Sequence, residues 1–279
     1  MKQGMFTIRS NRKLTQSVCE MVLAGDTSAC ERPGQFLNIK LDGLFLRRPI
    51  SVCDYDDEAI KIIYKIVGKG TQAMAEMQLG QTLDVLTGLG NGYDICKAGA
   101  SPVLIGGGVG IPPLYGLLKA LNRQRAADAE TARAETAACK IHDAGEACTG
   151  GGLANGEAAG SEKIRVILGF NTKEEIFYRE EFEAAGAEVL LATADGSAGT
   201  KGFVTDVLEG LDYSYFYTCG PEAMFRAIER IARTSGQYSF EERMGCGFGA
   251  CMGCSCKTRY GSKRICKDGP VLEREEILW

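Results

Sequence analysis

The 279-residue sequence predicts a six-stranded antiparallel β-barrel, then a parallel-sheet α/β domain, then a short cysteine-rich region. Short strand-like runs with few helical stretches fill the chain to about residue 88, which is typical of a small barrel. After residue 99, apolar strands alternate with helical stretches, as in a parallel sheet covered by helices. Four closely spaced cysteines stand near the carboxyl end. The predicted regions are therefore 1–99, 100–240 and 241–279.

The composition is that of a globular protein, with 45% hydrophobic and 24% charged residues. A net charge of −4, with Lys and Arg dispersed, disfavours nucleic acid and an anionic membrane as partners. No apolar stretch follows the first lysine, so no secretory signal is visible and we expect a cytoplasmic protein. The uncharged stretch 98–118 has the length of a membrane span, but its glycines and prolines break any continuous helix.

Six runs in the first region are predicted strands, separated by turn-rich segments. They lie at 6–10, 14–24, 35–41, 47–55, 59–68 and 82–88. The fifth shows the strand period most clearly, because Lys61 and Lys65 alternate with apolar side chains between Ile60 and Ile66. This strand should be half-buried, as the wall of a barrel is.

The second region has the alternation of an α/β sheet. Its predicted strands lie at 101–108, 164–170, 188–193 and 213–220. Predicted helices lie at 173–186, 203–210 and 221–233. After the first strand, Leu114, Leu117, Leu118 and Leu121 have the spacing of a helix with one apolar face.

Residues 124–162 interrupt this alternation. They are rich in Ala, Gly, Glu and Thr, so we expect a solvated insertion that is partly helical early and loose later. Cys139, His142 and Cys148 lie in it, but no fourth ligand accompanies them and a metal site is not favoured there. Since His142 is the only histidine of the chain, nucleophilic triads that need histidine and zinc sites with several histidines are strongly disfavoured.

Two stretches of the barrel region have the residue types of a flavin site. "RRPISV" at 47–52 places an arginine near a serine on one strand, which suits a pyrophosphate and the edge of a flavin ring. "IYKIVGKGT" at 63–71 ends in a Gly-Thr pair that could open a short helix and present N–H groups to phosphate. The alternative is an exposed arginine and an ordinary turn.

Glycines follow the first strand of the α/β region in "LIGGGVGIPPL" at 104–114. Glycine at this point lets the backbone approach a diphosphate, and Pro112 suits the first turn of a helix. The strict G-x-G-x-x-G pattern fails because Ile111 occupies the last glycine position, so a purely structural turn is the alternative. "TCGP" at 218–221 also ends a strand, where open parallel sheets bind ligands.

The cysteine spacing predicts a metal cluster. Cys246, Cys251 and Cys254 read C-x4-C-x2-C, and Cys266 follows later, which is the plant-type spacing for a 2Fe-2S cluster. The glycines between them let the backbone wrap the cluster. A structural zinc site is the main alternative, although zinc more often uses two C-x2-C pairs or adds histidine. We interpret Cys256 as a spectator.

Together these stretches resemble the ferredoxin-reductase superfamily and, within it, the electron-transfer subunits of type B dihydroorotate dehydrogenases. The motifs that carry the resemblance are "RPIS", "IYK", "GKGT", "GGGVGIPPL", "TCGPEAM", "EERMGCGFGACMGCSCK" and "CKDGPVL". The resemblance implies that FAD is bound by Arg48, Pro49, Ile50, Ser51, Ile63, Tyr64, Lys65, Gly70 and Thr71. It implies NAD at Gly107, Gly108, Val109, Gly110, Cys219, Gly220 and Pro221. The 2Fe-2S ligands would be Cys246, Cys251, Cys254 and Cys266.

The resemblance also implies an activity. Electrons would pass from the FMN of a separate catalytic subunit to the 2Fe-2S cluster, to FAD and, as hydride, to NAD+, within a heterotetramer of two copies of each chain. A catalytic (β/α) barrel takes about 250 residues by itself, so the dihydroorotate site must lie on the partner. No catalytic acid or base is assigned. The alternatives are a subunit of a hydrogenase or of an NADH-dependent ferredoxin:NADP oxidoreductase, or a zinc-stapled interaction module without redox activity.

Overall fold

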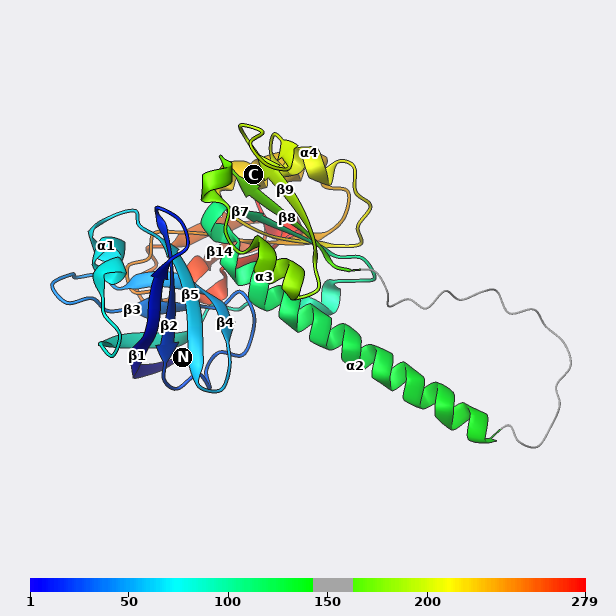
Figure 1. Ribbon diagram of the computed structural model, residues 1–279, viewed down its shortest axis with the longest axis horizontal. Helices are drawn as coiled ribbons and strands as arrows, with labels where there is room; N and C mark the ends of the chain where they lie inside the picture. Colours follow the sequence, from blue (N-terminus) through cyan, green and yellow to red (C-terminus); the bar gives the residue numbers. More distant parts are fainter. Residues whose placement is uncertain (143–162) are drawn as a thin grey trace, which may run out of the picture.

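The computed structural model describes residues 1–142 and 163–279, and it contains a closed barrel beside a seven-stranded sheet (Figure 1). The barrel order is β1-β2-β5-β4-β3-β6, with all neighbours antiparallel. The strands are β1 (Lys2–Lys13), β2 (Val18–Ala24), β3 (Phe36–Ile39), β4 (Arg48–Tyr55), β5 (Ala59–Lys65) and β6 (Thr82–Leu89). The predicted six-stranded antiparallel barrel is thus confirmed.

Along each barrel strand, side chains alternate between the barrel interior and the outside, and the inward-facing ones form the core of the barrel. On β5, Ile62 and Tyr64 belong to the interior cluster, while Ile63 faces outward into the core shared with the second domain. The short helix α1 (Lys69–Glu76) rests on β1, because the Asn11 side chain donates to the carbonyls of Met74 and Met77 at 2.9 and 3.0 Å.

The second sheet has the order β10-β9-β8-β7-β11-β12-β15. Its strands are β7 (Val103–Gly107), β8 (Arg165–Phe170), β9 (Glu188–Thr193), β10 (Thr200–Lys201), β11 (Phe216–Cys219), β12 (Gly236–Ser239) and β15 (Val271–Glu273). The helices are α2 (Pro112–His142), α3 (Arg179–Ala184), α4 (Val204–Leu208) and α5 (Glu222–Ile231), with 3₁₀ turns η1 (Ile95–Lys97), η2 (Gly108–Gly110), η3 (Lys173–Glu175) and η4 (Arg274–Glu276). The α/β fold is confirmed, but one edge strand, β15, runs antiparallel to the rest.

A polar network fixes β15 to the sheet. Glu273 accepts hydrogen bonds from Gln237 at 2.8 Å and Tyr215 at 2.9 Å, and it pairs with Lys97 at 2.8 Å. Nothing in the local sequence of 271–273 predicts this pairing, since the three residues are too few to show a period. The carboxyl-terminal region therefore contributes a strand to the nucleotide sheet.

The predicted helix at 173–186 is interrupted. The structure has η3, then a break at Tyr178 with φ of +64°, then α3. The break places the Tyr178 hydroxyl 2.6 Å from the buried carboxylate of Glu20 on the barrel. Burial raises the pKa of Glu20, but hydrogen bonds from Arg12 and Tyr178 outweigh it, so that pKa lies below its usual range. A contact between the two domains thus overrides the helical pattern.

The first part of helix α2 packs between the two domains, and its later part extends away from them. A side chain at Gly116 would come within 2.8 Å of the Cys53 carbonyl of β4, so the helix packs directly on the barrel. Further along, Asn122 donates to the Ala185 carbonyl at 2.8 Å. Residues 126–133 are exposed, and Figure 1 shows this end of α2 projecting from the molecule. The helix therefore runs well past residue 124, where we expected the insertion to begin.

The insertion's remaining residues, with Cys148, lie outside the described residues, as do the side chains of Cys139 and His142. In the part of the chain that is described, no helix is both long and apolar enough to cross a bilayer.

The carboxyl-terminal region forms a hairpin and a short helix before β15. These are β13 (Ser255–Thr258), β14 (Gly261–Arg264) and α6 (Ile265–Asp268). Asn91, between the two domains, donates to the Val271 carbonyl at 2.7 Å and accepts from its N–H at 3.1 Å. The region is therefore fastened both to the sheet and to the linker.

We predict that deleting residues 126–160 leaves FAD and iron bound. Asn122, and Arg125, which donates to the Ala100 carbonyl, hold α2 to the domains ahead of the deleted segment, and residues 126–133 are exposed. The deletion therefore leaves these contacts in place. Flavin absorbance and iron content per chain measure the outcome. Loss of FAD from a folded deletion variant would contradict it.

Candidate functional site

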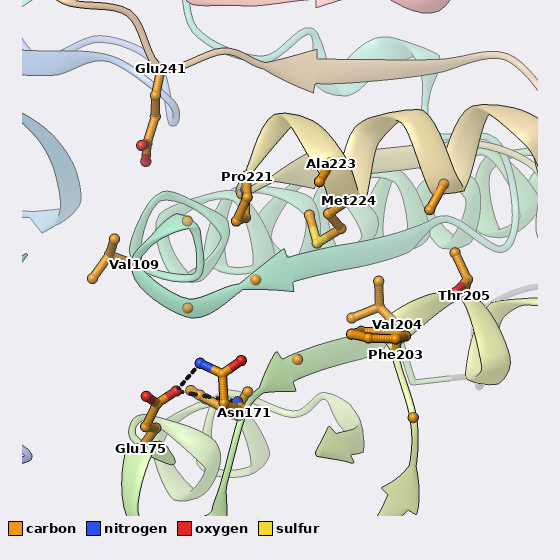
Figure 2. Close-up of a pocket in the computed structure, with 18 of the residues that line it drawn as sticks. Val109, Asn171, Glu175, Phe203, Val204, Thr205, Pro221, Ala223, Met224 and Glu241 are labelled. Carbon is orange, nitrogen blue, oxygen red and sulfur yellow. Dashed lines mark hydrogen bonds between the residues drawn. The ribbon is translucent and has the colours of Figure 1, made fainter. Parts of the chain in front are cut away.

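A pocket of about 490 Å³ opens at the carboxyl ends of β7, β8 and β11 (Figure 2). Six of the residues predicted for NAD line it: Gly107, Gly108, Val109, Gly110, Gly220 and Pro221. The seventh, Cys219, is fully buried beside them, and burial raises the pKa of its thiol. Cys219 thus remains a protonated thiol under the pocket.

The turn after β7 needs glycine because it packs closely against the end of the neighbouring strand β11. A Cβ atom at Gly110 would come within 2.4 Å of the Cys219 carbonyl oxygen, so η2 and the end of β11 can be this close only with glycine there. Pro112 and Pro113 begin α2 and have no N–H. The backbone N–H groups of this turn are therefore those of residues 108–111, of which Ile111 donates to the Gly108 carbonyl at 3.2 Å.

The opposite wall was not predicted from the sequence. Asn171 and Glu175 follow β8 and are hydrogen-bonded to each other at 2.9 Å, and Phe203 precedes α4 (Figure 2). The Phe203 ring is 68% exposed although it is large and apolar, which suits stacking on a flat base. The sequence marked Phe203 only as a helix start, and no local signal separates these roles.

Two charged groups of opposite sign complete the pocket. Lys65 reaches it from barrel strand β5, and Glu241 enters from the segment after β12 (Figure 2). The Glu241 side chain is exposed to solvent where it meets the pocket, and partial desolvation by the surrounding protein raises its pKa. Glu241 was quoted in the "EERM" motif but was not assigned a role. Lys65, predicted for FAD, thus lines the pocket whose glycines are predicted for NAD.

Within residues 1–142 and 163–279, the arginine of the predicted flavin site has no acidic partner. Arg48 lies against the start of α1, since a Cβ at Gly70 would be 2.2 Å from its Nε. Its hydrogen bonds go to the backbone carbonyls of Leu46 and Arg47. Arg47, by contrast, pairs with Asp84 at 2.9 Å. The Arg48 guanidinium is therefore the one suited to a diphosphate, and the fit of this site to FAD rests on it.

The other predicted flavin residues divide by the face they occupy. Pro49, Ile50 and Ser51 are partly buried on β4. Tyr64 points into the barrel, where its hydroxyl donates to Asn11 at 3.1 Å, so only its backbone can contact a ligand outside. Thr71 uses its hydroxyl to accept the N–H of Val67 at 2.9 Å and closes its own turn.

The four predicted cluster cysteines come together as two pairs. The Cys246 thiol lies beside that of Cys251, and the Cys254 thiol lies beside that of Cys266. Cys254 and Cys266 are buried, Cys251 is exposed and Cys246 is intermediate. The segment is thus a loop with one side in the core and the other at the surface.

Backbone N–H groups point at these sulfurs. Ala250 and Cys251 donate to Cys246 Sγ at 3.2 and 3.4 Å, and Cys266 donates to Cys254 Sγ at 3.4 Å. Burial raises the pKa of Cys246, but the N–H donors outweigh it and lower that pKa to about 6. Burial and the Cys254 thiol raise the pKa of Cys266 to about 12. Donors aimed at a thiolate are what a cluster ligand requires.

The pairing of the thiols bears on the kind of metal site. In residues 1–142 and 163–279, no group of three or more His, Cys, Asp or Glu side chains is arranged to hold a metal ion. Two pairs of cysteines suit a 2Fe-2S cluster, in which each iron takes two thiolates. Cys256 lies apart on β13, partly buried and paired in register with Lys263.

Comparisons with known proteins agree with both sites. Residues 241–278 match the family described as the iron-sulfur cluster binding domain of dihydroorotate dehydrogenase B, and residues 104–230 match the oxidoreductase NAD-binding domain. Among solved structures, an NADH-dependent reduced ferredoxin-NADP oxidoreductase is 27% identical, with a TM-score of 0.78 over 99% of this chain and 90% of that one. A Neisseria gonorrhoeae ferredoxin NADP+ reductase with bound FAD and NADP shares the fold, with 15% identity and a TM-score of 0.62 over 86% of this chain and 100% of that one.

Two curated relatives cover almost the whole chain, and both are named dihydroorotate dehydrogenase B (NAD(+)), electron transfer subunit. The Bacillus mycoides protein is 36% identical over 99% of this chain and 98% of its own length. The Fusobacterium nucleatum protein is 37% identical over 97% of this chain and 96% of its own length. The resemblance inferred from the motifs is confirmed. The chain is an oxidoreductase subunit and belongs to the family of electron transfer subunits of NAD+-dependent dihydroorotate dehydrogenase B.

Proposed function

We propose that this chain passes electrons from the FMN of a dihydroorotate dehydrogenase catalytic subunit, through a 2Fe-2S cluster and FAD, to NAD+ in pyrimidine biosynthesis. The single observation that carries the proposal is the cysteine loop with its two thiol pairs, beside a barrel and a nucleotide pocket of the ferredoxin-reductase type. The cluster carries single electrons and the flavin converts them to the pair that a hydride needs.

Different parts of the chain would bind the three redox groups. Cys246, Cys251, Cys254 and Cys266 hold the cluster. Arg48 and the turn at Gly70 bind the FAD diphosphate, with β4 and the outer face of β5 beside the flavin. The backbone of residues 108–110 binds the NAD diphosphate and Phe203 stacks on its base. Lys65, proposed for FAD, lines the pocket proposed for NAD.

The partner docks on the exposed side of the cluster loop. Phe248 and Met252 are 44% and 55% exposed although both are apolar, and Cys251 between them is exposed as well. Apolar groups around a ligand cysteine suit a protein interface that brings a second redox centre close. We propose that the catalytic subunit covers this face in a heterotetramer of two copies of each chain. The cluster thiolates need a reducing compartment, which supports the cytosol as the location.

A role in a ferredoxin:NADP oxidoreductase is the second candidate, because a structure of that kind covers 99% of this chain. The native partner distinguishes the two. Purification of the tagged chain from its own cells should bring down an FMN-containing subunit that oxidises dihydroorotate. A second flavoprotein acting on ferredoxin would contradict the first assignment. A visible spectrum, with about two irons and one FAD per chain, tests both against a colourless zinc protein.

We predict that Cys251→Ser prevents cluster assembly and stops electron flow to the partner, while NADH still reduces bound FAD. The exposed Cys251 thiol is a ligand, and a serine hydroxyl is a far weaker one for iron. Iron content, acid-labile sulfide and anaerobic flavin bleaching by NADH measure the result. Cys256→Ser is the matched control and should retain its iron. Unchanged cluster content in Cys251→Ser would show that the ligand set is wrong.

We predict that Arg48→Met weakens FAD binding about tenfold to hundredfold, because one or two charge-assisted hydrogen bonds to phosphate are lost at about 1.5–3 kcal/mol. Arg47→Met is the control. It removes the ion pair with Asp84 and should lower the free energy of unfolding, with FAD affinity unchanged. FAD titration of the apoprotein measures both variants. Equal losses of FAD affinity would refute the distinction between the two arginines.

We predict that Glu241→Gln raises the thermal midpoint at neutral pH. Partial desolvation raises the pKa of Glu241, so its contribution to stability is complete only below the pKa of an unfolded glutamate, about 4.3, and is lost as the pH rises through the folded pKa. The gain from glutamine should therefore shrink as the pH falls toward 4. Melting curves of both proteins between pH 4 and 8 test this, with Glu242→Gln as control, because the neighbouring Glu242 does not line the pocket. A gain independent of pH would contradict it.

A further inference from the structure

Asn38 connects the flavin side of the barrel to the cluster loop. It lies on β3, where it pairs in register with Pro49 of the predicted flavin strand β4. Its side chain donates from Nδ2 to the Cys246 carbonyl oxygen at 3.2 Å. Asn38 therefore contacts both Pro49, which is predicted to bind FAD, and Cys246, which is predicted to bind the cluster.

The fold makes room for this contact. Asn38 is 1% exposed, although an amide is costly to bury. The loop passes so near that a Cβ atom at Gly247 would lie 2.3 Å from Asn38 Nδ2, and Gly247 has a φ of +78°. Phe36, two residues before Asn38 and on the same face of β3, packs in the core cluster that contains Cys254. The outer face of β3 is therefore the floor of the cluster loop.

The Asn38 amide is only half satisfied. Its Nδ2 has the Cys246 carbonyl, whereas the buried Oδ1 accepts no hydrogen bond from any residue in the described chain. Buried side-chain oxygens usually have a partner, and an apolar residue of the same size would avoid the loss. Asn38 is therefore placed for something other than packing.

We infer that Asn38 is a positioning residue for electron transfer between the cluster and FAD. Its amide holds the Cys246 segment against the flavin strand, with the positive N–H end of the amide dipole toward the loop. This orientation stabilises the reduced cluster, because hydrogen bonds and dipoles near the sulfurs tune the potential. The Cys246 segment would hold the cluster, which would supply one electron at a time to FAD, and two such transfers with one proton would supply the hydride for NAD+.

The inference rests on the proposed function, since it requires both cofactors in this chain, and Asn38→Leu tests it. Leucine keeps the size and removes both polar groups. We expect FAD and iron contents equal to wild type and unchanged reduction of FAD by NADH. The cluster potential should fall by a tenfold shift of its equilibrium, which is about 59 mV for one electron, and transfer between cluster and FAD should slow at least tenfold.

Asn91→Leu is the matched control, because Asn91 also fastens the carboxyl-terminal region through its amide. Its hydrogen bonds go to Val271 and to the Asp268 carbonyl, which follow the cluster cysteines, and not to the Cys246 segment. It should lower the melting temperature and leave the cluster potential unchanged. Asn38→Ser serves if the leucine variant loses its iron, and it should lower the potential in the same direction. Potentiometry followed by electron paramagnetic resonance, and stopped-flow mixing with NADH, give the readouts.

The outcomes separate the two levels of the proposal. A wild-type chain without FAD or iron would overturn the proposed function and this inference with it. Asn38 variants that hold both cofactors and keep the wild-type potential and transfer rate would overturn the inference alone. An equal shift of potential in Asn91→Leu would also overturn it, because the effect would then be general loosening of the region.

Discussion

The antiparallel pairing of β15 with β12 is the constraint on which the placement of the redox sites depends. The cluster loop lies between these two strands in the chain, so pairing them at one sheet edge closes the loop beside the sheet. Glu273 secures the pairing through Tyr215, Gln237 and Lys97. Glu241, which enters the nucleotide pocket, stands five residues before Cys246 in the same segment. One short stretch of chain therefore borders the pocket and the cluster.

The candidate sites contain polar groups whose interactions within the described part of the fold are incomplete. Arg47 forms an ion pair with Asp84, whereas the neighbouring Arg48 donates to the backbone carbonyls of Leu46 and Arg47 and has no acidic partner among the described residues. Glu241 faces the pocket with its pKa raised by partial desolvation, and Asn38 keeps a buried oxygen without a donor in the described chain. Each of these costs stability in the absence of a ligand. Such local conflicts are expected where function, and not folding, selects the residue.

The pocket proposed for NAD and the loop proposed for the cluster open on different parts of the surface. The nucleotide pocket opens at the strand ends of the sheet, while the exposed thiol and apolar residues of the cluster loop face the surface. A partner subunit docked on the loop, as we propose, and NAD in the pocket would thus occupy different surfaces. Helix α2, packed on β4 near Gly116, and the hydrogen bond from Tyr178 to Glu20 hold barrel and sheet together so that the flavin strand stays beside both.

The sequence by itself determined the kind and order of most elements, the glycine turn and the cluster spacing, because periodicity and ligand spacing are local. It also determined the family, through short motifs that need no contacts to be read. Only the tertiary structure decided that β15 joins the sheet antiparallel, that Tyr64 faces the barrel interior, and that Phe203 lines the pocket. These features depend on residues far apart in the chain. The tertiary structure also decided which of two adjacent arginines forms an ion pair. Asp84 lies 37 residues beyond Arg47, and only the closed barrel brings these two residues together.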